Sequence, residues 1–225
     1  MEHHFWQDKW DNNKLGFHEG QPNELLTNYF HTLHLSPNQS VFLPLCGKTR
    51  DIAWLLGHGY RVVGAELIES AIIQLFEELE ITPTRTIQDD LIHYNAPNID
   101  IFVGDIFHLK AEQIAPIDAV YDRAALVALP ESMRRQYSKH LMALTQCAPQ
   151  LLITYEYNQD LVQGPPFSIH PEEVHLHYDA FYTFELLDRI DVDGGVHGKH
   201  NAQESIWRLE KKLNKILLDL DAKEA

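Results

Sequence analysis

The stretch VFLPLCGKTRDIAWLLGHGYRVVGAE, residues 41–66, decides the fold that the sequence predicts. It opens with an apolar run over 41–45 that has the length of a buried strand. A tight turn follows, in which Gly47 can take backbone angles that other residues resist. Apolar side chains at helical spacing then predict a helix over 49–56, which two glycines end. A second apolar run closes on an acid, Glu66.

A strand, a glycine turn, a helix and a strand ending in a carboxylate form half of a doubly wound nucleotide-binding fold. Glu66 lies about twenty residues beyond the turn, the spacing at which such folds bind ribose hydroxyls. The turn offers one glycine, Gly47, whereas a dinucleotide pyrophosphate needs close backbone approach at two or three points. The pattern therefore favours a nucleoside without phosphate over NAD or ATP. Any α/β domain whose second strand ends in Glu remains the alternative at this point.

The rest of the chain alternates between strand and helix patterns, which is typical of an α/β, doubly wound fold with a mostly parallel sheet. Further strands are predicted at 99–104, 117–121, 151–155, 182–190 and 205–211. Further helices are predicted at 69–80, 130–146 and 171–178. A glycine-rich connection joins the last two strands, which predicts an antiparallel edge. Charged residues follow three strands, at Glu66, Asp105 and the pair Asp122–Arg123, where such sheets bind ligands.

Residues 5–35 predict one or two helices ahead of the first strand. Trp6 and Trp10 are four residues apart, so they share one helical face. Such a pair beside a glycine-bearing break forms either an aromatic lid or a cover for the core. The pattern alone favours the core interpretation.

Composition and charge exclude several classes of protein. A formal charge of -15 on 225 residues argues against nucleic acid and anionic membranes as partners, because both need a basic face. Two cysteines build no disulfide framework, and the start of the chain lacks the features of a signal peptide, so we expect a cytoplasmic protein. No apolar run reaches the length of a membrane span. We expect a monomer of one domain, 1–225, with an N-terminal helical segment over 1–35 and a charged tail over 212–225.

Several short motifs follow one another along the chain. They are Phe5-Trp6-x-x-x-Trp10 with Gly16-Phe17-His18, Pro44-Leu45-Cys46-Gly47-Lys48, Val63-Gly64-Ala65-Glu66, the run Tyr121 to Leu129, and Gly164-Pro165-Pro166-Phe167. Each motif is modest, but together they are highly specific and extend over residues 5–211. The combination resembles the thiopurine S-methyltransferases. That resemblance implies a seven-stranded class I methyltransferase fold that uses S-adenosylmethionine, in agreement with a pocket that holds no phosphate.

The resemblance also implies positions for the site. The implied cofactor contacts are Trp10, Leu45, Glu66 and Arg123, with Asp105 and Ile106 by the adenine. The segment from Trp6 to Phe17 is implied to fold over the cofactor as a lid. Phe17, Pro165 and Pro166 match positions that flank the acceptor. One region departs from the family, whose members often carry an arginine facing the substrate in the loop before the last strand. Here that loop, 194–204, offers His197, Lys199 and His200, which leaves the acceptor open.

Methyl transfer from a sulfonium is an in-line displacement that needs alignment and exclusion of water. A heteroaromatic thiol is acidic enough to arrive largely as the thiolate, so we assign no catalytic base. Arg123 is a candidate for holding the methionine carboxylate or for positioning an anionic acceptor. Its structural alternative is a salt bridge to Asp105 or Asp122. Trp10 can attract the sulfonium through its aromatic face.

Other residues with reactive side chains are given structural roles. Cys46 has no base or acid partner nearby in the sequence, so we interpret it as a spacer in a tight turn rather than a nucleophile. His175 and His177 are two residues apart and face apart on a helix. Together with the other histidines of this half they match no metal-ligand spacing, so we expect surface histidines and no metal. Residues 191–194 lack the remaining positions of a calcium loop and predict a turn.

The sequence thus predicts an S-adenosylmethionine-dependent methyltransferase that acts on the sulfur of small aromatic or heterocyclic thiols. Methylation of selenium, tellurium or arsenic species is the alternative within enzymes. A protein that binds the cofactor without turnover is the alternative from another class. An NAD-dependent oxidoreductase is disfavoured by the single glycine of the turn.

Overall fold

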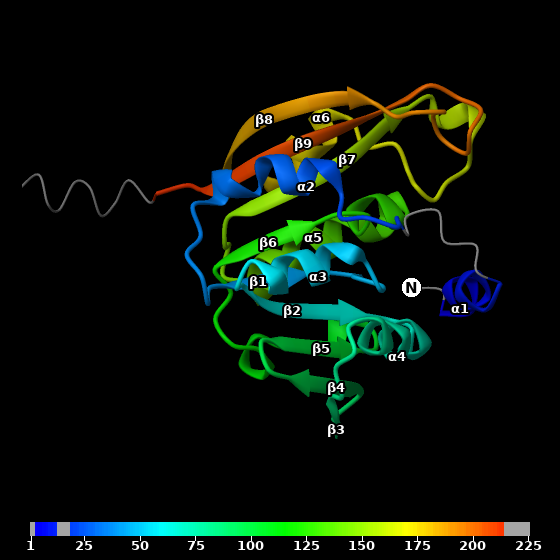
Figure 1. Cartoon of the computed structure of the whole chain (residues 1–225). Coiled ribbons are helices and arrows are strands. Elements are labelled where there is room, and N and C mark those ends of the chain that lie inside the picture. Colours follow the sequence, from blue (N-terminus) through cyan, green and yellow to red (C-terminus); the bar gives the residue numbers. More distant parts are fainter. Residues whose placement is uncertain (1–2, 13–18, 214–225) are drawn as a thin grey trace, which may run out of the picture.

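The computed structural model describes residues 3–12 and 19–213. Its strands are β1 (Ser40–Leu43), β2 (Arg61–Glu66), β3 (Thr84–Gln88), β4 (Leu91–Ala96), β5 (Ile99–Val103), β6 (Ala119–Asp122), β7 (Gln150–Tyr157), β8 (Tyr182–Asp191) and β9 (Ala202–Lys211). They form one sheet in the order β3-β4-β5-β2-β1-β6-β7-β9-β8 (Figure 1). The strands from β5 to β7 in this order are parallel to one another, which confirms the predicted parallel centre.

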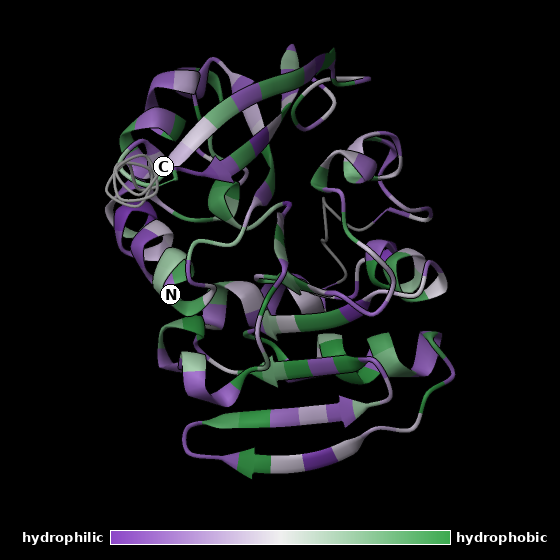
Figure 2. Ribbon diagram, turned by 90° about the vertical axis from the view of Figure 1, so that its left-hand side faces the viewer, coloured by the Kyte–Doolittle hydropathy of each residue, from purple (hydrophilic) through white to green (hydrophobic). Residues whose placement is uncertain are grey.

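Antiparallel strands close both edges of this sheet, not one. β9 pairs with β7 and β8 pairs with β9, as the sequence predicted for its last two strands. At the other edge, β3 and β4 add an antiparallel hairpin to the seven predicted strands. The sequence TRTIQ of β3 is exposed at four of its five residues, so it lacks the apolar alternation by which strands are recognised (Figure 2).

Helices cover both faces of the sheet. They are α1 (His3–Asp11), α2 (Glu24–Tyr29), α3 (Arg50–Gly57), α4 (Glu69–Glu78), α5 (Glu131–Leu144) and α6 (Pro171–Tyr178). The last four agree with the predicted helices to within two residues at each end. No helix in residues 3–12 and 19–213 is long and apolar enough to cross a membrane.

The core divides into two main layers, one on each face of the sheet. Val41 and Leu43 of β1 pack in one layer with residues of α2, α3 and α4. Phe42, which points to the opposite face, packs in the other layer with residues of α5 and α6. The doubly wound arrangement predicted from the sequence is therefore confirmed.

Local sequence fixes how α3 begins and ends beside β1. The Thr49 hydroxyl accepts a hydrogen bond of 3.3 Å from the Asp51 amide and caps the helix. The chain leaves α3 through Gly59, whose φ of +83° lies in the left-handed region that glycine tolerates. β2 pairs parallel to β1, so the carboxyl ends of both strands lie at the same rim of the sheet. α1 lies beyond this rim (Figure 1).

Candidate functional site

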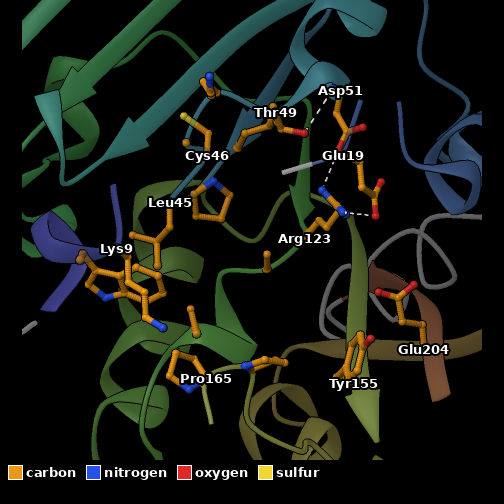
Figure 3. Close-up of a pocket in the computed structure, with 18 of the residues that line it drawn as sticks. Lys9, Glu19, Leu45, Cys46, Thr49, Asp51, Arg123, Tyr155, Pro165 and Glu204 are labelled. Carbon is orange, nitrogen blue, oxygen red and sulfur yellow. Dashed lines mark hydrogen bonds and ion pairs between the residues drawn. The ribbon is translucent and has the colours of Figure 1, made fainter. Parts of the chain in front are cut away.

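A cavity of about 780 Å³ opens at the carboxyl ends of the parallel strands. Its walls come from the turn after β1, the ends of β2 and β6, the strands β7 and β9, helix α1 and the connection 192–198 (Figure 3). Cavities of this size are typical of small-molecule and cofactor sites. This is the position in which doubly wound sheets bind their ligands.

The turn after β1 forms the floor of the cavity beside α1. Leu45 and Gly47 both have left-handed φ angles, of 48° and 53°. A Cβ atom at Gly47 would lie 3.2 Å from the Trp10 ring, tighter than nearly all real contacts of that kind. Gly47 therefore lets the indole of Trp10 pack directly on the turn.

Trp6 and Trp10 are half-buried and both line the cavity, which confirms their shared face. Neither contributes to the described core layers. The interpretation of this pair as a cover for the core was wrong, because α1 lies off the rim rather than on a face of the sheet (Figure 1). The rest of the proposed lid, including Phe17, lies outside the described residues.

Glu66 ends β2 and joins it to the turn after β1. Its Oε2 accepts a hydrogen bond of 2.8 Å from the Gly47 amide, and its Oε1 accepts one of 2.9 Å from the Ile68 amide. Burial raises the pKa of Glu66, while these backbone donors oppose the rise. Each carboxylate oxygen can accept a second hydrogen bond, so Glu66 can hold the turn and still accept from a ligand in the cavity.

Arg123 follows β6, and its buried guanidinium lies between two acids (Figure 3). Its Nη2 is 2.7 Å from Glu19 Oε1, and its Nη1 is 3.6 Å from Asp51 Oδ2. These partners differ from Asp105 and Asp122, the two acids named from the sequence.

The side chain of Asp122 is occupied elsewhere. It accepts hydrogen bonds of 2.7 Å from the Tyr137 hydroxyl and 3.1 Å from the Leu126 amide. Tyr137 lies on α5, in the core layer on one face of the sheet, whereas Asp51 belongs to α3, which covers the other. Successive residues of a strand point to opposite faces, so Asp122 and Arg123 reach different partners.

Asp51 organises the wall behind Arg123. It is 1% exposed, and its Oδ1 accepts a hydrogen bond of 2.8 Å from the Asn23 amide. Its Oδ2 accepts one of 3.1 Å from the Tyr121 hydroxyl. The acid thus ties α3 to the start of α2 and to β6. The sequence showed Asp51 only as a helix first-turn acid, since its partners are distant in the chain.

Pro165 and Pro166 line the cavity opposite these strand ends. The Tyr157 hydroxyl donates a hydrogen bond of 2.5 Å to the Pro166 carbonyl. The Phe167 amide donates one of 2.6 Å to the Val127 carbonyl. The proline loop is therefore fixed to β7 and to the segment after β6.

Tyr155 and Glu204 also line the cavity, and sequence reasoning missed both. They are register partners on β7 and β9. The signal for Tyr155 was its place near the carboxyl end of a predicted parallel strand. Glu204 lies in the loop before the last predicted strand, where the family resemblance pointed to a cation rather than an acid.

Asp105 and Ile106 do not line the described cavity. Ile106 is buried in a core layer, and Asp105 caps the short turn of helix at Ile106–His108 by accepting from the Phe107 amide at 3.1 Å. Both follow β5, the neighbour of β2 in the sheet. Their assignment to the adenine stays a prediction.

Cys46 and the histidines have structural surroundings. Burial raises the pKa of the Cys46 thiol well above its usual range, which favours the spacer interpretation over a nucleophile. His175 is exposed and His177 is buried, so the two face apart as predicted. The expectation of a surface position was wrong for His177, whose Nε2 lies 3.1 Å from Glu173 Oε1 one turn earlier on α6. Within residues 3–12 and 19–213, no group of His, Cys, Asp and Glu is arranged to hold a metal ion.

Comparison with known proteins places the chain in a family. Residues 1–216 match the family model described as thiopurine S-methyltransferase. The chain belongs to this family. A protein of Xanthobacter autotrophicus named thiopurine S-methyltransferase is 50% identical over 212 residues, which are 94% of this chain and 100% of that protein. One of Teredinibacter turnerae with the same name is 46% identical over 95% of this chain and 100% of its own length.

Solved structures of more distant proteins share the fold. A Burkholderia thailandensis 1,6-didemethyltoxoflavin-N1-methyltransferase, determined with bound S-adenosylhomocysteine, superposes with a TM-score of 0.65 at 16% identity. It covers 93% of this chain and 87% of its own. An S-adenosylmethionine-dependent methyltransferase from Anabaena variabilis has a TM-score of 0.62 at 14% identity over 93% and 95% of the two chains.

Family membership confirms the predicted activity class, an S-adenosylmethionine-dependent methyltransferase. The residues present fit that donor. Five carboxylates (Glu19, Asp51, Glu66, Asp193 and Glu204) and three Lys or Arg side chains (Lys9, Lys48 and Arg123) line the described cavity. An acidic wall suits a cationic sulfonium. A turn with one glycine amide, already bonded to Glu66, provides no cradle for a phosphate.

Proposed function

We propose that the methyl acceptor is the sulfur of a small aromatic or heterocyclic thiol. The observation that carries this proposal is that one cavity joins Glu66 and Trp10 to Pro165 and Pro166. A nucleoside donor and a flat acceptor can therefore lie side by side in this cavity, with no protein atoms between them. The relatives named thiopurine S-methyltransferase support the same class of acceptor.

The donor half of the proposed site is built on the turn after β1 and the end of β2. Glu66 accepts from the ribose hydroxyls through the lone pairs that Gly47 and Ile68 leave free. Trp10 offers an aromatic face to the sulfonium, and Leu45 packs beneath the nucleoside. Trp6 covers the donor from α1, and Asp105 with Ile106 lies toward the adenine.

The acceptor half is built on the proline loop and the end of β6. Pro165 and Pro166 form an apolar wall for a flat ring, and Arg123 positions the acceptor from the opposite side. Phe17 is proposed to complete this wall. When bound, S-adenosylmethionine supplies an electrophilic methyl group on its sulfonium. The side chains around it align the acceptor sulfur with that methyl and exclude water.

We further propose that residues 1–225 act as one methyltransferase domain, with α1 as the lid and 212–225 as a tail. The lid expected over 1–35 is too long, because Leu25 and Leu26 of α2 are buried in a core layer. α1 lies beyond the rim of the sheet (Figure 1). Its residues Trp6 and Trp10 line the cavity, which supports a lid.

Methyl release from labelled S-adenosylmethionine tests the proposed acceptor. The panel contains thiophenol, heterocyclic thiols, selenite, tellurite and arsenite, and we expect turnover on the thiols. Turnover on the metalloid species alone would replace the proposed acceptor, and no turnover on any of them would favour a binding protein. Donor binding is measured separately by thermal shift, where S-adenosylhomocysteine at a hundred times its dissociation constant adds about 2.7 kcal/mol and NAD adds none.

A further inference from the structure

Glu204 and Tyr155 form a polar pair on the wall of the acceptor half. They lie opposite one another on the antiparallel strands β9 and β7. Directly opposite residues of such strands point to the same face, and both side chains line the cavity on the Arg123 side (Figure 3). Within residues 3–12 and 19–213, no group forms a hydrogen bond with the Glu204 carboxylate or the Tyr155 hydroxyl. The pair is therefore available to a ligand.

The charges around Glu204 disfavour an anionic acceptor. Arg123, whose charge acts on Glu204, is already paired with Glu19 and Asp51. Lys48 also lines the cavity, but its ammonium lies 2.7 Å from the carboxylate of Glu78, which does not line it. A thiolate or an oxyanion beside Glu204 and Glu19 would lie next to two like charges. A neutral acceptor that donates a hydrogen bond would instead satisfy the free carboxylate.

Heterocyclic thiols with a nitrogen next to the carbon that carries sulfur have this property. In their thione form the ring is neutral, the sulfur is a nucleophile and the adjacent N–H is a donor. We propose that Glu204 binds the ring N–H of such a thione and receives its proton as the sulfur is methylated. This inference rests on the proposed function, and it adds Glu204 to the proposed site as the residue that binds and deprotonates acceptors of this kind.

The step balances in atoms and charge. The acceptor sulfur forms a new S–CH3 bond while the S–CH3 bond of the sulfonium breaks, and that electron pair remains on a neutral thioether. The ring N–H bond breaks, and its electron pair restores an aromatic, neutral S-methyl product. The proton passes to Glu204, which becomes a carboxylic acid and later releases it to water.

Two properties of the pair suit this task. Burial raises the pKa of Glu204, with Arg123 opposing the rise and Glu19 adding to it, so the carboxylate is a better base than an exposed one. Burial, with Glu204 and Glu19 close by, raises the pKa of Tyr155 to about 12, so the phenol stays protonated. Its O–H can then donate to Glu204 or to the acceptor sulfur.

The test compares Glu204→Gln with the wild type on two acceptors of similar shape. 2-Thiopyridone carries the N–H beside C=S, and thiophenol lacks it. We expect kcat/KM for 2-thiopyridone to fall about 100-fold, the usual contribution of a positioned base. Turnover of thiophenol should be unchanged or faster. Glu210→Gln is the matched control, because it makes the same change on β9 about 20 Å along the strand, outside the cavity lining.

A binding measurement without turnover completes the test. Calorimetry of the S-adenosylhomocysteine complex should show weaker binding of 2-thiopyridone, but not of thiophenol, in Glu204→Gln. Equal losses on both acceptors, or no loss on 2-thiopyridone, would overturn the role of Glu204 while leaving the proposed function intact. A wild-type enzyme that methylates neither acceptor would overturn the proposed function, and this inference with it.

Discussion

The amide of Gly47 donates a 2.8 Å hydrogen bond to the carboxylate of Glu66, nineteen residues away in the chain. The turn after β1 and the end of β2 therefore meet at one buried acid on the wall of the cavity. The two carboxylate oxygens of Glu66 hold the local backbone and are also the proposed acceptors for the ligand. A change at Glu66 must then affect the site and the fold together.

Glu66→Ala is expected to raise the Michaelis constant for S-adenosylmethionine about tenfold or more, because the ribose hydroxyls lose their acceptor. The amides of Gly47 and Ile68 also lose their partner, which costs about 1–3 kcal/mol of stability for each without unfolding the protein. Steady-state kinetics and urea unfolding measure the two effects. Glu77→Ala, at an exposed position on α4, is the control. An unchanged Michaelis constant would remove Glu66 from the donor site.

Gly47→Ala should weaken donor binding by disturbing the contact with α1. The left-handed φ of 53° costs an L residue about 1–2 kcal/mol, and the new Cβ meets the Trp10 ring at 3.2 Å. Gly57→Ala is the matched control, because nothing lies within 4 Å of its Cβ position and its φ is not left-handed. Equilibrium binding of S-adenosylhomocysteine should fall in the first variant alone. Equal binding in both would show that Trp10 does not depend on the turn.

Asp122 is expected to make stability fall as pH rises. Burial raises its pKa from 3.8 to about 6, against the hydrogen bonds from Tyr137 and Leu126. The folded protein then holds this proton more tightly than the unfolded chain, so the unfolding free energy decreases between about pH 4 and pH 6. The decrease is about 3 kcal/mol.

Urea unfolding at several pH values checks this expectation by difference. The titratable groups that face Asp122 are the hydroxyls of Tyr137 and Tyr178. The pKa of each hydroxyl is raised well above 10, so both tyrosines stay neutral between pH 4 and pH 6. The difference in unfolding free energy between the wild type and Asp122→Asn should therefore change between pH 4 and pH 6. Above pH 6 this difference should be constant. A gap that is constant over the whole range would contradict the raised pKa.

The parallel centre of the fold was predictable because its five strands, β5, β2, β1, β6 and β7 in sheet order, are short apolar runs. The helices between them carry an apolar face. Leu45, Glu66 and Arg123 lie at or just after the carboxyl ends of three of these strands, so their place on one rim follows from topology. The hairpin of β3 and β4 was not predictable, because its outer strand is exposed and polar.

The partners of Arg123 could not be predicted because they depend on contacts between distant segments. Asp51 reaches Arg123 only because its carboxylate is held by the Asn23 amide and the Tyr121 hydroxyl. Trp6 and Trp10 show a related limit. A helical pair of tryptophans has the same pattern whether its apolar face covers a sheet or a cavity.

Arg123→Lys is expected to separate the two roles proposed for this residue. Lysine keeps the charge that Asp51 and Glu19 need but loses the planar fork that reaches both acids and a ligand together. Because Arg123 lies on the same side of the cavity as Tyr155 and Glu204, we expect a loss of about tenfold in kcat/KM for the acceptor, or about 1.4 kcal/mol. Binding of S-adenosylhomocysteine should not change, as in the exposed control Arg135→Lys on α5. A loss of S-adenosylhomocysteine affinity with normal use of the acceptor would instead assign Arg123 to the methionine carboxylate.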